Sequence, residues 1–392
     1  MRLGIFGGTF NPIHEGHIKT ADYFTETLSL DKVLLMPAKT PPHKEVKDLA
    51  KGTDRYNMCD LAARAYDELE ASDIELSMGD PSYTINTLEE VLEEFPGANL
   101  FLLMGSDMFF TIQDWHRYED IKELVTICAV SRDEGEREEM LEHGRVLQTG
   151  GAEVFIGDMD PFPVSSTEIR RRIAAGESTD RLLNPHERRY IDGIGIYKGD
   201  VDGFEKYDEL VEKMEKPRRA FHSRCVASEA ARLAAMYGVD VEKAYIAGLL
   251  HDLLHNIPST EMLQMVENSD ILLSSAQKEF PAVWHGILGA EWLRQNQVIT
   301  DEEILGAITH HTIGGSGMTA LDKVVFCADK TSLDRDYEDV WTARERVDES
   351  LNDGFQYIIS HNIQNQLDRE ESIFKETWEA YNENVKALQK GE

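Results

Sequence analysis

The chain opens with the stretch Gly7-Gly8-Thr9-Phe10-Asn11-Pro12-Ile13-His14-Glu15-Gly16-His17, which decides the fold of its first half. An apolar run from Leu3 to Phe6 precedes it and predicts a buried strand, and residues 18–24 predict a helix. The two glycines let the backbone approach a ligand closely, and the first turn of a helix offers free amide donors to an anion. His14 and His17 add imidazole donors for phosphoryl oxygens. The stretch therefore predicts a phosphate-binding site on a strand–turn–helix unit.

Composition limits the class of protein. A length of 392 residues predicts two domains. The formal net charge of −33 argues against a nucleic-acid-binding surface, and no apolar run reaches membrane-spanning length. Met1-Arg2 leads directly into the first predicted strand, so we expect no signal peptide and a cytoplasmic protein. The cysteines form no CxxC pair and predict reduced, mostly buried thiols: Cys59, Cys128, Cys225 and Cys327.

Strands and helices alternate through the first 197 residues. Apolar runs predict strands at Lys32–Pro37, Leu100–Met104 and Val125–Val130, and helical periodicity marks Asp54–Leu69 and Thr84–Phe95. Such alternation predicts an α/β, doubly wound, Rossmann-like parallel sheet, with ligands at the carboxyl ends of its strands.

The second half has a different pattern of predicted secondary structure, because none of its segments predicts a strand. A linker is expected at Gly199–Gly203. We therefore divide the chain into a domain at 1–198, a linker and connecting helix at 199–217, and an all-α bundle at 218–392. Helices are predicted at 223–237, 241–254, 283–295, 301–309 and 321–330. The amphipathic tail from Asp368 to Lys390 predicts a closing helix and a candidate homo-oligomer contact.

Three further segments of the first half suit a nucleotide. Ser166 and Thr167 stand where a late helix begins, and Arg170 follows one turn later, so all three can bind polyphosphate oxygens. Trp115 has the flat face needed to stack on a pyridine ring, although a lone tryptophan is more often a core residue. The loop that ends in Lys44 can bring positive charge over a ligand.

As a set, these segments resemble the bacterial nicotinate-mononucleotide adenylyltransferases of the nucleotidylyltransferase superfamily, whose signature is His-x-Gly-His. The resemblance covers residues 1–197 and implies transfer of AMP from ATP to nicotinate mononucleotide, which gives deamido-NAD and pyrophosphate. It implies that His14 and His17 are catalytic, with His17 stabilising charge on the α-phosphate. The implied ATP-binding residues are Gly7, Gly8, Thr9, Phe10, His14, His17, Asp107, Ser166, Thr167 and Arg170. The implied nicotinate-nucleotide-binding residues are Lys44, Tyr83, Thr84 and Trp115.

The residues agree with this chemistry. The substrate's own phosphate attacks, so catalysis needs positioning and charge stabilisation instead of a protein nucleophile. Mg²⁺ is expected to accompany ATP. A phosphopantetheine adenylyltransferase is the alternative. The segment Ser82-Tyr83-Thr84 and the segment with Trp115 weigh against it.

The second half carries histidines and aspartates in a defined order. The pair His251-Asp252 lies between apolar residues of a predicted helix, so it is expected to be buried, and a metal ion is the simplest partner for a buried carboxylate. Imidazole and carboxylate donors suit iron or manganese, in a mono- or dinuclear centre. His222 is expected to open the first helix of the bundle.

In this order the residues resemble the HD phosphohydrolase superfamily, and most closely its YqeK-like branch. The implied metal ligands are His222, His251, Asp252, His285, His311 and Asp329, with Asp252 also catalytic. The branch implies cleavage of diadenosine tetraphosphate to two ADP. Two positions depart from its pattern, since His255 replaces a lysine and Gly315 an arginine that could have met substrate phosphates. Hydrolysis of another nucleotide and a non-catalytic regulatory role therefore stay open.

Some other charged residues are expected to lie outside these sites. Arg218 and Arg219 are expected to be surface charge, and His310 a neighbour of the ligands or a surface residue.

Overall fold

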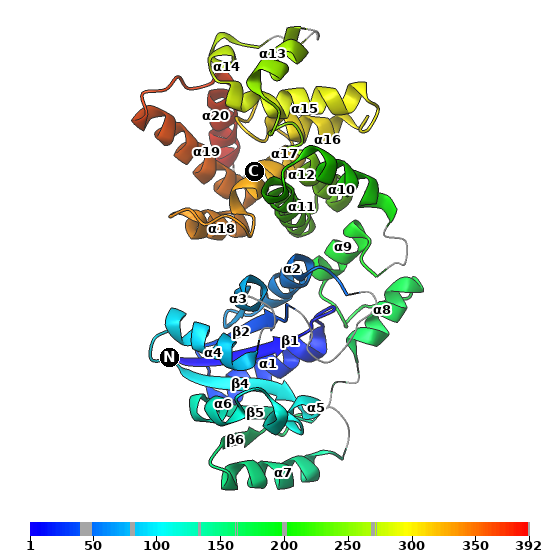
Figure 1. Cartoon of the computed structure of the whole chain (residues 1–392), viewed down its shortest axis with the longest axis vertical. Helices are drawn as coiled ribbons and strands as arrows, with labels where there is room; N and C mark the ends of the chain where they lie inside the picture. The colour runs from blue at the N-terminus through cyan, green and yellow to red at the C-terminus, as the bar shows by residue number, and fades with distance from the viewer. Residues whose placement is uncertain are drawn as a thin grey trace. The chain divides into compact units, whose positions relative to one another are not determined.

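The computed structural model describes residues 1–39, 49–78, 83–131, 135–160, 162, 164–197, 202–267, 271 and 273–390. Contacts divide the chain into two compact units. The first comprises Met1–Arg188 and Ile196–Gly199, and the second comprises Arg189–Gly195 and Asp200–Glu392. Figure 1 colours the two units along the chain.

The first unit is built on a six-stranded parallel sheet in the order β3-β2-β1-β4-β5-β6. Its strands are β1 (Arg2–Gly8), β2 (Lys32–Pro37), β3 (Leu69–Ala71), β4 (Asn99–Gly105), β5 (Val125–Val130) and β6 (Glu153–Ile156). This is the Rossmann order, in which the direction of winding reverses between β1 and β4. The predicted α/β fold is confirmed, and a ligand crevice is expected beyond the carboxyl ends of these two strands.

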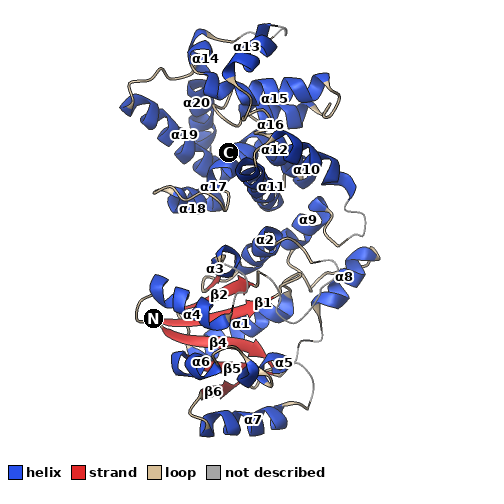
Figure 2. Cartoon of the chain, viewed as in Figure 1, coloured by secondary structure: helices blue, strands red, loops and turns tan. Residues whose placement is uncertain are grey.

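Helices connect the strands of the first unit (Figure 2). They are α1 (Glu15–Leu28), α2 (Gly52–Ala63), α3 (Ile74–Ser77), α4 (Thr84–Glu94), α5 (Ser106–Phe109), η1 (Ile112–Asp114), α6 (Tyr118–Leu124), α7 (Arg137–Thr149) and α8 (Ser166–Ala174). The central strands are buried on both faces, as their continuous apolar runs predict.

The described elements of the second unit are all helices, as predicted (Figure 2). They are α9 (Pro185–Ile194), which begins in the first unit, α10 (Asp202–Met214), α11 (Pro217–Tyr237), α12 (Val241–Leu250), α13 (Ser259–Glu267), α14 (Ser275–Glu279), η2 (Pro281–Val283), α15 (Trp284–Gln295), α16 (Glu302–His310), α17 (Ala320–Thr331), α18 (Val340–Glu349), α19 (Leu351–Asp368) and α20 (Lys375–Lys390). Within the described part of the chain, no helix is both long and apolar enough to cross a bilayer.

Several predicted boundaries in the first unit are wrong. The helix predicted to run to Leu69 ends at Ala63, because residues 69–71 alternate between buried and exposed and pair with β2. The edge strand β6 was not predicted, since only four residues form it beside β5.

Boundaries in the second unit also differ from the prediction. The helix predicted to run to residue 254 ends at Leu250, so His251 and Asp252 lie in the turns that follow α12 and not inside a helix. His222 does not open a helix, because α11 begins at Pro217. The tail is not one helix, since Asp368 ends α19 and α20 begins at Lys375. All four cysteines are buried and unpaired, as expected.

Candidate functional site

The turn after β1 is held by buried polar side chains. Asn11 is 2 % exposed, and its Oδ1 accepts hydrogen bonds from the Tyr197 hydroxyl at 2.6 Å and the Ala50 amide at 3.0 Å. Arg55 is 1 % exposed and donates to the carbonyl oxygen of Thr9 at 2.8 Å. Neither Tyr197 nor Arg55 was predicted, because each reaches the turn from a distant segment. These bonds fix the backbone that leads from β1 to the two histidines.

The two histidines of the opening stretch stack on each other at the start of α1. Nδ1 of His14 accepts a hydrogen bond from the amide of Gly16 at 3.2 Å, which assigns the proton of a neutral ring to Nε2. The rings of His14 and His17 lie 3.8 Å apart between centroids, with 27° between their planes. The ring of Phe10 meets His17 edge to face at 5.1 Å. This packing presents the two imidazoles as one group at the carboxyl end of β1.

The first turn of α8 contacts the same loop. Ser166 donates from Oγ to the carbonyl oxygen of Pro12 at 2.8 Å, and Arg170 donates from Nη1 to the carbonyl oxygen of Asn11 at 2.7 Å. Nη2 of Arg170 also donates to Thr167 Oγ1 at 3.3 Å. The structure thus brings the three predicted α8 residues to the loop that precedes His14.

The residues predicted for the nicotinate ring lie on other loops of the first unit. Tyr83 caps α4 and is 40 % exposed, and its ring stands 4.2 Å from that of His116. The indole nitrogen of Trp115 is buried and makes no hydrogen bond within the described residues. Thr84 is the first residue of α4. Lys44 lies outside the described residues.

Asp107 lies at the end of β4, the strand beside β1. It occupies the short helix α5, directly after the strand, and it is exposed. Because β1 and β4 flank the point where the strand order reverses, Asp107 and the opening stretch share one edge of the sheet.

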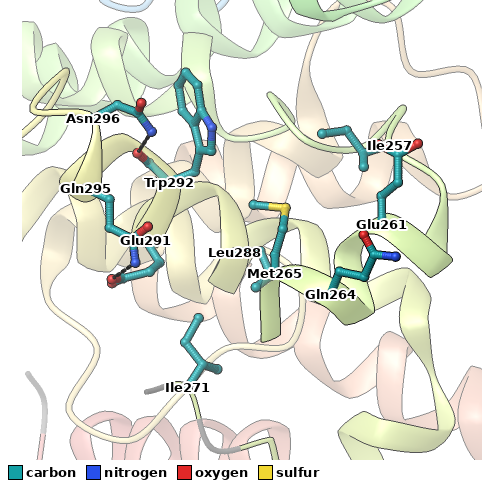
Figure 3. A pocket seen from close by; sticks show the side chains of 10 residues that line it. All are labelled: Ile257, Glu261, Gln264, Met265, Ile271, Leu288, Glu291, Trp292, Gln295 and Asn296. Atoms are coloured by element: carbon teal, nitrogen blue, oxygen red, sulfur yellow. Dashed lines mark hydrogen bonds between the residues drawn. The ribbon is translucent and has the colours of Figure 1, made fainter. Parts of the chain in front are cut away.

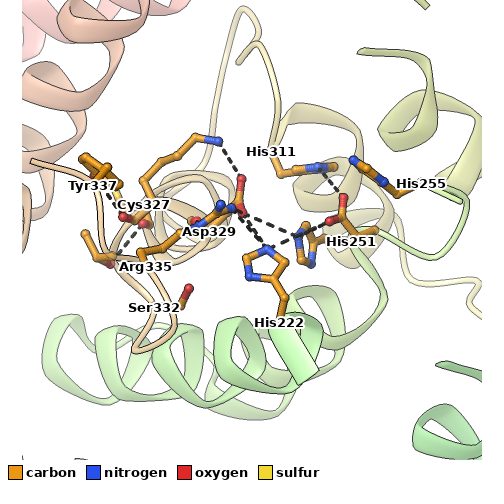
Figure 4. Close-up of polar contacts among 12 residues, drawn as sticks. His222, His251, His255, His311, Cys327, Asp329, Ser332, Arg335 and Tyr337 are labelled. Carbon is orange, nitrogen blue, oxygen red and sulfur yellow. Dashed lines mark hydrogen bonds and ion pairs between the residues drawn. The ribbon is translucent and has the colours of Figure 1, made fainter. Parts of the chain in front are cut away.

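In the second unit, the six predicted metal ligands come together from five helices and the turns that follow two of them. Figure 4 labels four of them: His222, His251, His311 and Asp329. Two groups have donor atoms within 4.8 Å of one another: His222 with His251 and Asp329, and His251 with Asp252 and His311. His285 joins them, since its Nε2 lies 3.0 Å from Asp252 Oδ1. All six side chains are buried.

Hydrogen bonds orient the four imidazoles in the same way. Three of them donate from Nδ1 to the backbone carbonyl three residues earlier: His251 to Gly248 at 2.7 Å, His285 to Ala282 at 2.8 Å and His311 to Ile308 at 2.7 Å. The fourth, His222, donates from Nδ1 to Asp334 Oδ2 at 2.8 Å. Each Nε2 therefore faces the centre of the cluster, which is how backbone carbonyls and carboxylates orient metal-bound histidines.

The centre of the cluster lacks protons for its own acceptors. Nε2 of His285 and Nε2 of His311 lie 3.0 Å apart although both rings already donate from Nδ1. Nε2 of His251 is buried without a hydrogen-bond partner in the described residues. A cation between these nitrogens and the two carboxylates would satisfy them, so the donor set fits a transition-metal ion.

The surroundings shift the pKa values of two histidines of the cluster in opposite directions. Burial lowers the pKa of His251, but the carboxylates of Asp252 and Asp329 outweigh burial and raise the pKa to about 10. Burial lowers the pKa of His311 to about 4. The carboxylates therefore favour a positive charge on His251, whereas burial disfavours one on His311.

Three cationic side chains surround the carboxylates of the predicted metal site, and the sequence did not reveal them. Arg219 donates to Asp252 Oδ2 at 2.6 Å. The expectation that Arg219 is only surface charge is therefore wrong. Lys330 donates to Asp329 Oδ2 at 2.7 Å, and Arg335 bonds both Asp329 and His222 (Figure 4). The one available signal for Arg219 was its position three residues before His222, on the same face of a helix.

The two departures from the HD pattern also have a structural context. His255 lies beside Arg219, with 3.2 Å between its Nε2 and Nη2 of the arginine. A Cβ atom on Gly315 would lie 2.6 Å from the ring of His310, so that ring fills the space beside the glycine. Nδ1 of His310 lies 3.5 Å from Asp322, and His310 belongs to neither of the two donor groups found among the described residues.

A separate cavity of about 560 Å³ lies between α13 and α15 (Figure 3). Met265, Leu288 and Trp292 supply apolar surface, and Glu261 and Glu291 supply carboxylates. None of the described residues that line it is a metal ligand.

Comparison with known proteins distinguishes the two halves. The Cytidylyltransferase-like family matches residues 5–172, and the HD domain family matches residues 219–334. A "Probable nicotinate-nucleotide adenylyltransferase" of Desulfatibacillum aliphaticivorans is 35% identical over 217 residues, which cover all of that protein and 50% of this chain. The chain belongs to the nicotinate-nucleotide adenylyltransferase family. A second such relative, from Caldicellulosiruptor saccharolyticus, is 36% identical and also aligns over its full length with 50% of this chain.

Solved structures resemble each half of this nicotinate-nucleotide adenylyltransferase family member. A "predicted HD superfamily hydrolase involved in NAD metabolism" from Clostridium acetobutylicum is 29% identical, with a TM-score of 0.46 over 47% of this chain and 98% of its own. The Plasmodium falciparum nicotinic acid mononucleotide adenylyltransferase complexed with NaAD is 18% identical, with a TM-score of 0.43 over 50% of this chain and 97% of its own. The two family matches and the full-length relatives confirm the predicted fusion of an adenylyltransferase family member with an HD domain.

Proposed function

We propose that the first unit transfers AMP from ATP to nicotinate mononucleotide and so produces deamido-NAD and pyrophosphate. The observation that carries this proposal is the meeting of α8 with the loop that leads to His14 and His17. The full-length similarity to relatives named for this activity supports it.

In this proposal, the residues at the end of β1 and the start of α8 hold the phosphates of ATP. His14 and His17 donate hydrogen bonds, and His17 stabilises the charge that develops on the α-phosphate. Ser166, Thr167 and Arg170 contact the phosphate chain, with Mg²⁺ entering as part of the ATP substrate. Asp107 contacts the adenylate side, and Gly7, Gly8, Thr9 and Phe10 contact the nucleotide.

On the acceptor side, Tyr83, Thr84 and Trp115 contact nicotinate mononucleotide, together with Lys44. The exposed Tyr83 ring provides a flat surface. The indole N–H of Trp115, which has no partner among the described residues, provides a hydrogen-bond donor.

The test is an assay of the full chain with ATP and nicotinate mononucleotide, with phosphopantetheine and nicotinamide mononucleotide as rival acceptors. Deamido-NAD formation that His17→Ala abolishes is expected. His186→Ala is the control, because His186 is a histidine of α9 outside the predicted site. Preference for phosphopantetheine would replace this proposal with the alternative member of the superfamily.

For the second unit, we propose a metal-dependent hydrolase of nucleotide polyphosphates, with diadenosine tetraphosphate cut to two ADP. The convergence of four Nε2 atoms on two buried carboxylates carries this proposal. The metal-holding residues are the six predicted ligands, and iron or manganese fits their donor atoms. When bound, the ion supplies a Lewis acid and a hydroxide nucleophile at neutral pH.

Hydrogen bonds within the protein orient the side chains of this site. The backbone carbonyls of residues 248, 282 and 308 hold three imidazoles with Nε2 inward, and Asp334 does the same for His222. Asp252 lies between His251 and His285, so its two oxygens can serve both groups of ligands.

The test measures metal content and product release by the full chain with diadenosine tetraphosphate and added iron or manganese. ADP release by the wild type and not by Asp252→Ala is expected, with adenylyl transfer intact in both. If the protein binds metal but hydrolyses only a different nucleotide, the proposed substrate is wrong and the proposed hydrolase activity stands. Bound metal without any hydrolysis would favour a regulatory module.

A further inference from the structure

We propose that Arg219, Lys330 and Arg335 bind the phosphate chain of a nucleotide polyphosphate at the entrance of the metal centre. This inference rests on the proposed hydrolase function of the second unit and assigns the residues that recognise its substrate.

The three side chains lie between the buried carboxylates and solvent. Arg219, Lys330 and Arg335 are 27, 28 and 31% exposed, whereas Asp252 and Asp329 are 4 and 7% exposed. Arg219 comes from the first turn of α11, Lys330 from the last turn of α17, and Arg335 from the loop that follows α17. The cations therefore approach the centre from different segments, on its solvent side.

Each cation is bonded to a carboxylate oxygen that a metal ion would also use. Arg219 donates a hydrogen bond to Oδ2 of Asp252. Lys330 donates to Oδ2 of Asp329, and Arg335 donates to Oδ1 of the same carboxylate. A bound metal ion competes for these oxygens and repels the three cations, because like charges at such distances interact strongly in a partly buried site. The cations then need another anion, and the phosphates of a metal-bound substrate are the nearest candidates.

The balance of charge also favours an anionic ligand. The chain carries a formal net charge of −33, yet this entrance gathers three cations against the carboxylates of Asp252, Asp329 and Asp334. A single divalent ion leaves positive charge in excess there. Two guanidinium forks and one ammonium group can contact more than one phosphoryl group, which suits a polyphosphate better than a monophosphate.

Neighbouring groups hold two of these side chains in place. Arg219 Nη2 contacts His255 Nε2 at 3.2 Å, and Nε of Arg335 donates to the carbonyl oxygen of Asp329 at 2.6 Å. Each guanidinium is thus anchored by an atom that is not a carboxylate oxygen, so it can keep its position when a metal ion takes the carboxylate.

The experiment uses the full chain loaded with manganese and freed of excess metal, and inorganic tripolyphosphate as the probe. Calorimetry measures probe binding, and the component that Asp252→Ala abolishes is assigned to the metal centre. Electron paramagnetic resonance measures the manganese affinity and confirms that the probe does not extract the metal.

The variants are Arg219→Gln, Lys330→Gln and Arg335→Gln, and the matched control is Arg224→Gln. Arg224 lies on the same helix as Arg219, is 28% exposed and pairs with Asp208 and Glu212, which are not metal ligands. Each site variant is expected to weaken probe binding about tenfold to a hundredfold, the usual worth of a charge-assisted hydrogen bond. Manganese affinity should be unchanged or tighter, since a repelling charge has been removed, and the control should change neither.

The outcomes separate this inference from the function on which it rests. A wild type that binds no manganese contradicts the proposed hydrolase itself. Manganese binding with unaltered tripolyphosphate affinity in all three variants overturns the inference alone. Loss of manganese from the variants also overturns it, because the cations would then be structural supports of the ligands.

Discussion

Ser166 donates a hydrogen bond of 2.8 Å to the carbonyl oxygen of Pro12, although 154 positions separate the two residues. The bond joins the first turn of α8 to the loop between β1 and α1, and Arg170 repeats the connection through Asn11. The first turn of α8 is therefore held against the loop that leads to the stacked pair His14–His17.

Replacing Ser166 should reduce catalysis more than stability. In Ser166→Ala, the loss of one hydrogen bond of about 1 kcal/mol should misplace the start of α8, and kcat/KM for ATP should fall about tenfold. Steady-state kinetics of adenylyl transfer measures this. Ser178→Ala is the control, because the one hydrogen bond that Ser178 Oγ accepts within the described residues is a local bond from the amide of Asp180. Equal kinetics in both variants would contradict a shared site.

Two neighbouring glycines should respond differently to alanine. A Cβ on Gly8 would lie 2.9 Å from the Phe10 ring, whereas a Cβ on Gly7 meets no described atom within 4 Å. Gly8→Ala should therefore lower stability by about 1–3 kcal/mol, the usual cost of overpacking. Gly7→Ala should keep its stability but bind ATP more weakly if the backbone approaches the nucleotide there. Denaturant unfolding and ATP titration of both variants check this.

The sequence predicted the elements that carry strong patterns. The apolar runs of β1, β2, β4 and β5 could be recognised because strands buried on both faces are continuously apolar. The short edge strands β3 and β6 could not, since only three or four residues form each of them and so short a segment has no distinctive pattern.

The histidines and aspartates of the proposed metal site were recognised from their order, whereas their surroundings were not. The end of α12 at Leu250 escaped prediction because apolar residues continue through Leu254. The helix ends where Nδ1 of His251 bonds the Gly248 carbonyl and the following turns tighten. The roles of Arg219 and Arg335 depend on long-range contacts with Asp252 and Asp329, which no local pattern encodes.

Asp334 should position His222 without being a ligand itself. Its Oδ2 accepts from His222 Nδ1 at 2.8 Å and its Oδ1 accepts from Ser332 at 2.8 Å. Asp334→Asn should weaken metal affinity about tenfold to a hundredfold, as is common for groups that orient a metal-bound histidine. Metal titration of the full chain measures this, with Asp336→Asn, an exposed neighbour, as control. Complete loss of metal would instead make Asp334 a ligand.

Glu75 should make the first unit less stable as the pH rises. Burial raises its pKa from 4.5 to about 6, despite the hydrogen bond from Thr87 Oγ1 at 3.1 Å and the charge of Arg55. The folded state therefore favours the protonated carboxyl, so its stabilising contribution is complete below pH 4.5 and is lost between pH 4.5 and about 6. Above that range, the buried ionised carboxylate lowers the free energy of unfolding by about 2 kcal/mol.

Glu75→Gln should match the wild type near pH 4 and unfold at a higher temperature at pH 8, as measured by calorimetry. Glu68→Gln, at an exposed position, should follow the wild type throughout. A Glu75→Gln variant that is less stable than the wild type at pH 8 would show that Glu75 is ionised and paired in the folded protein.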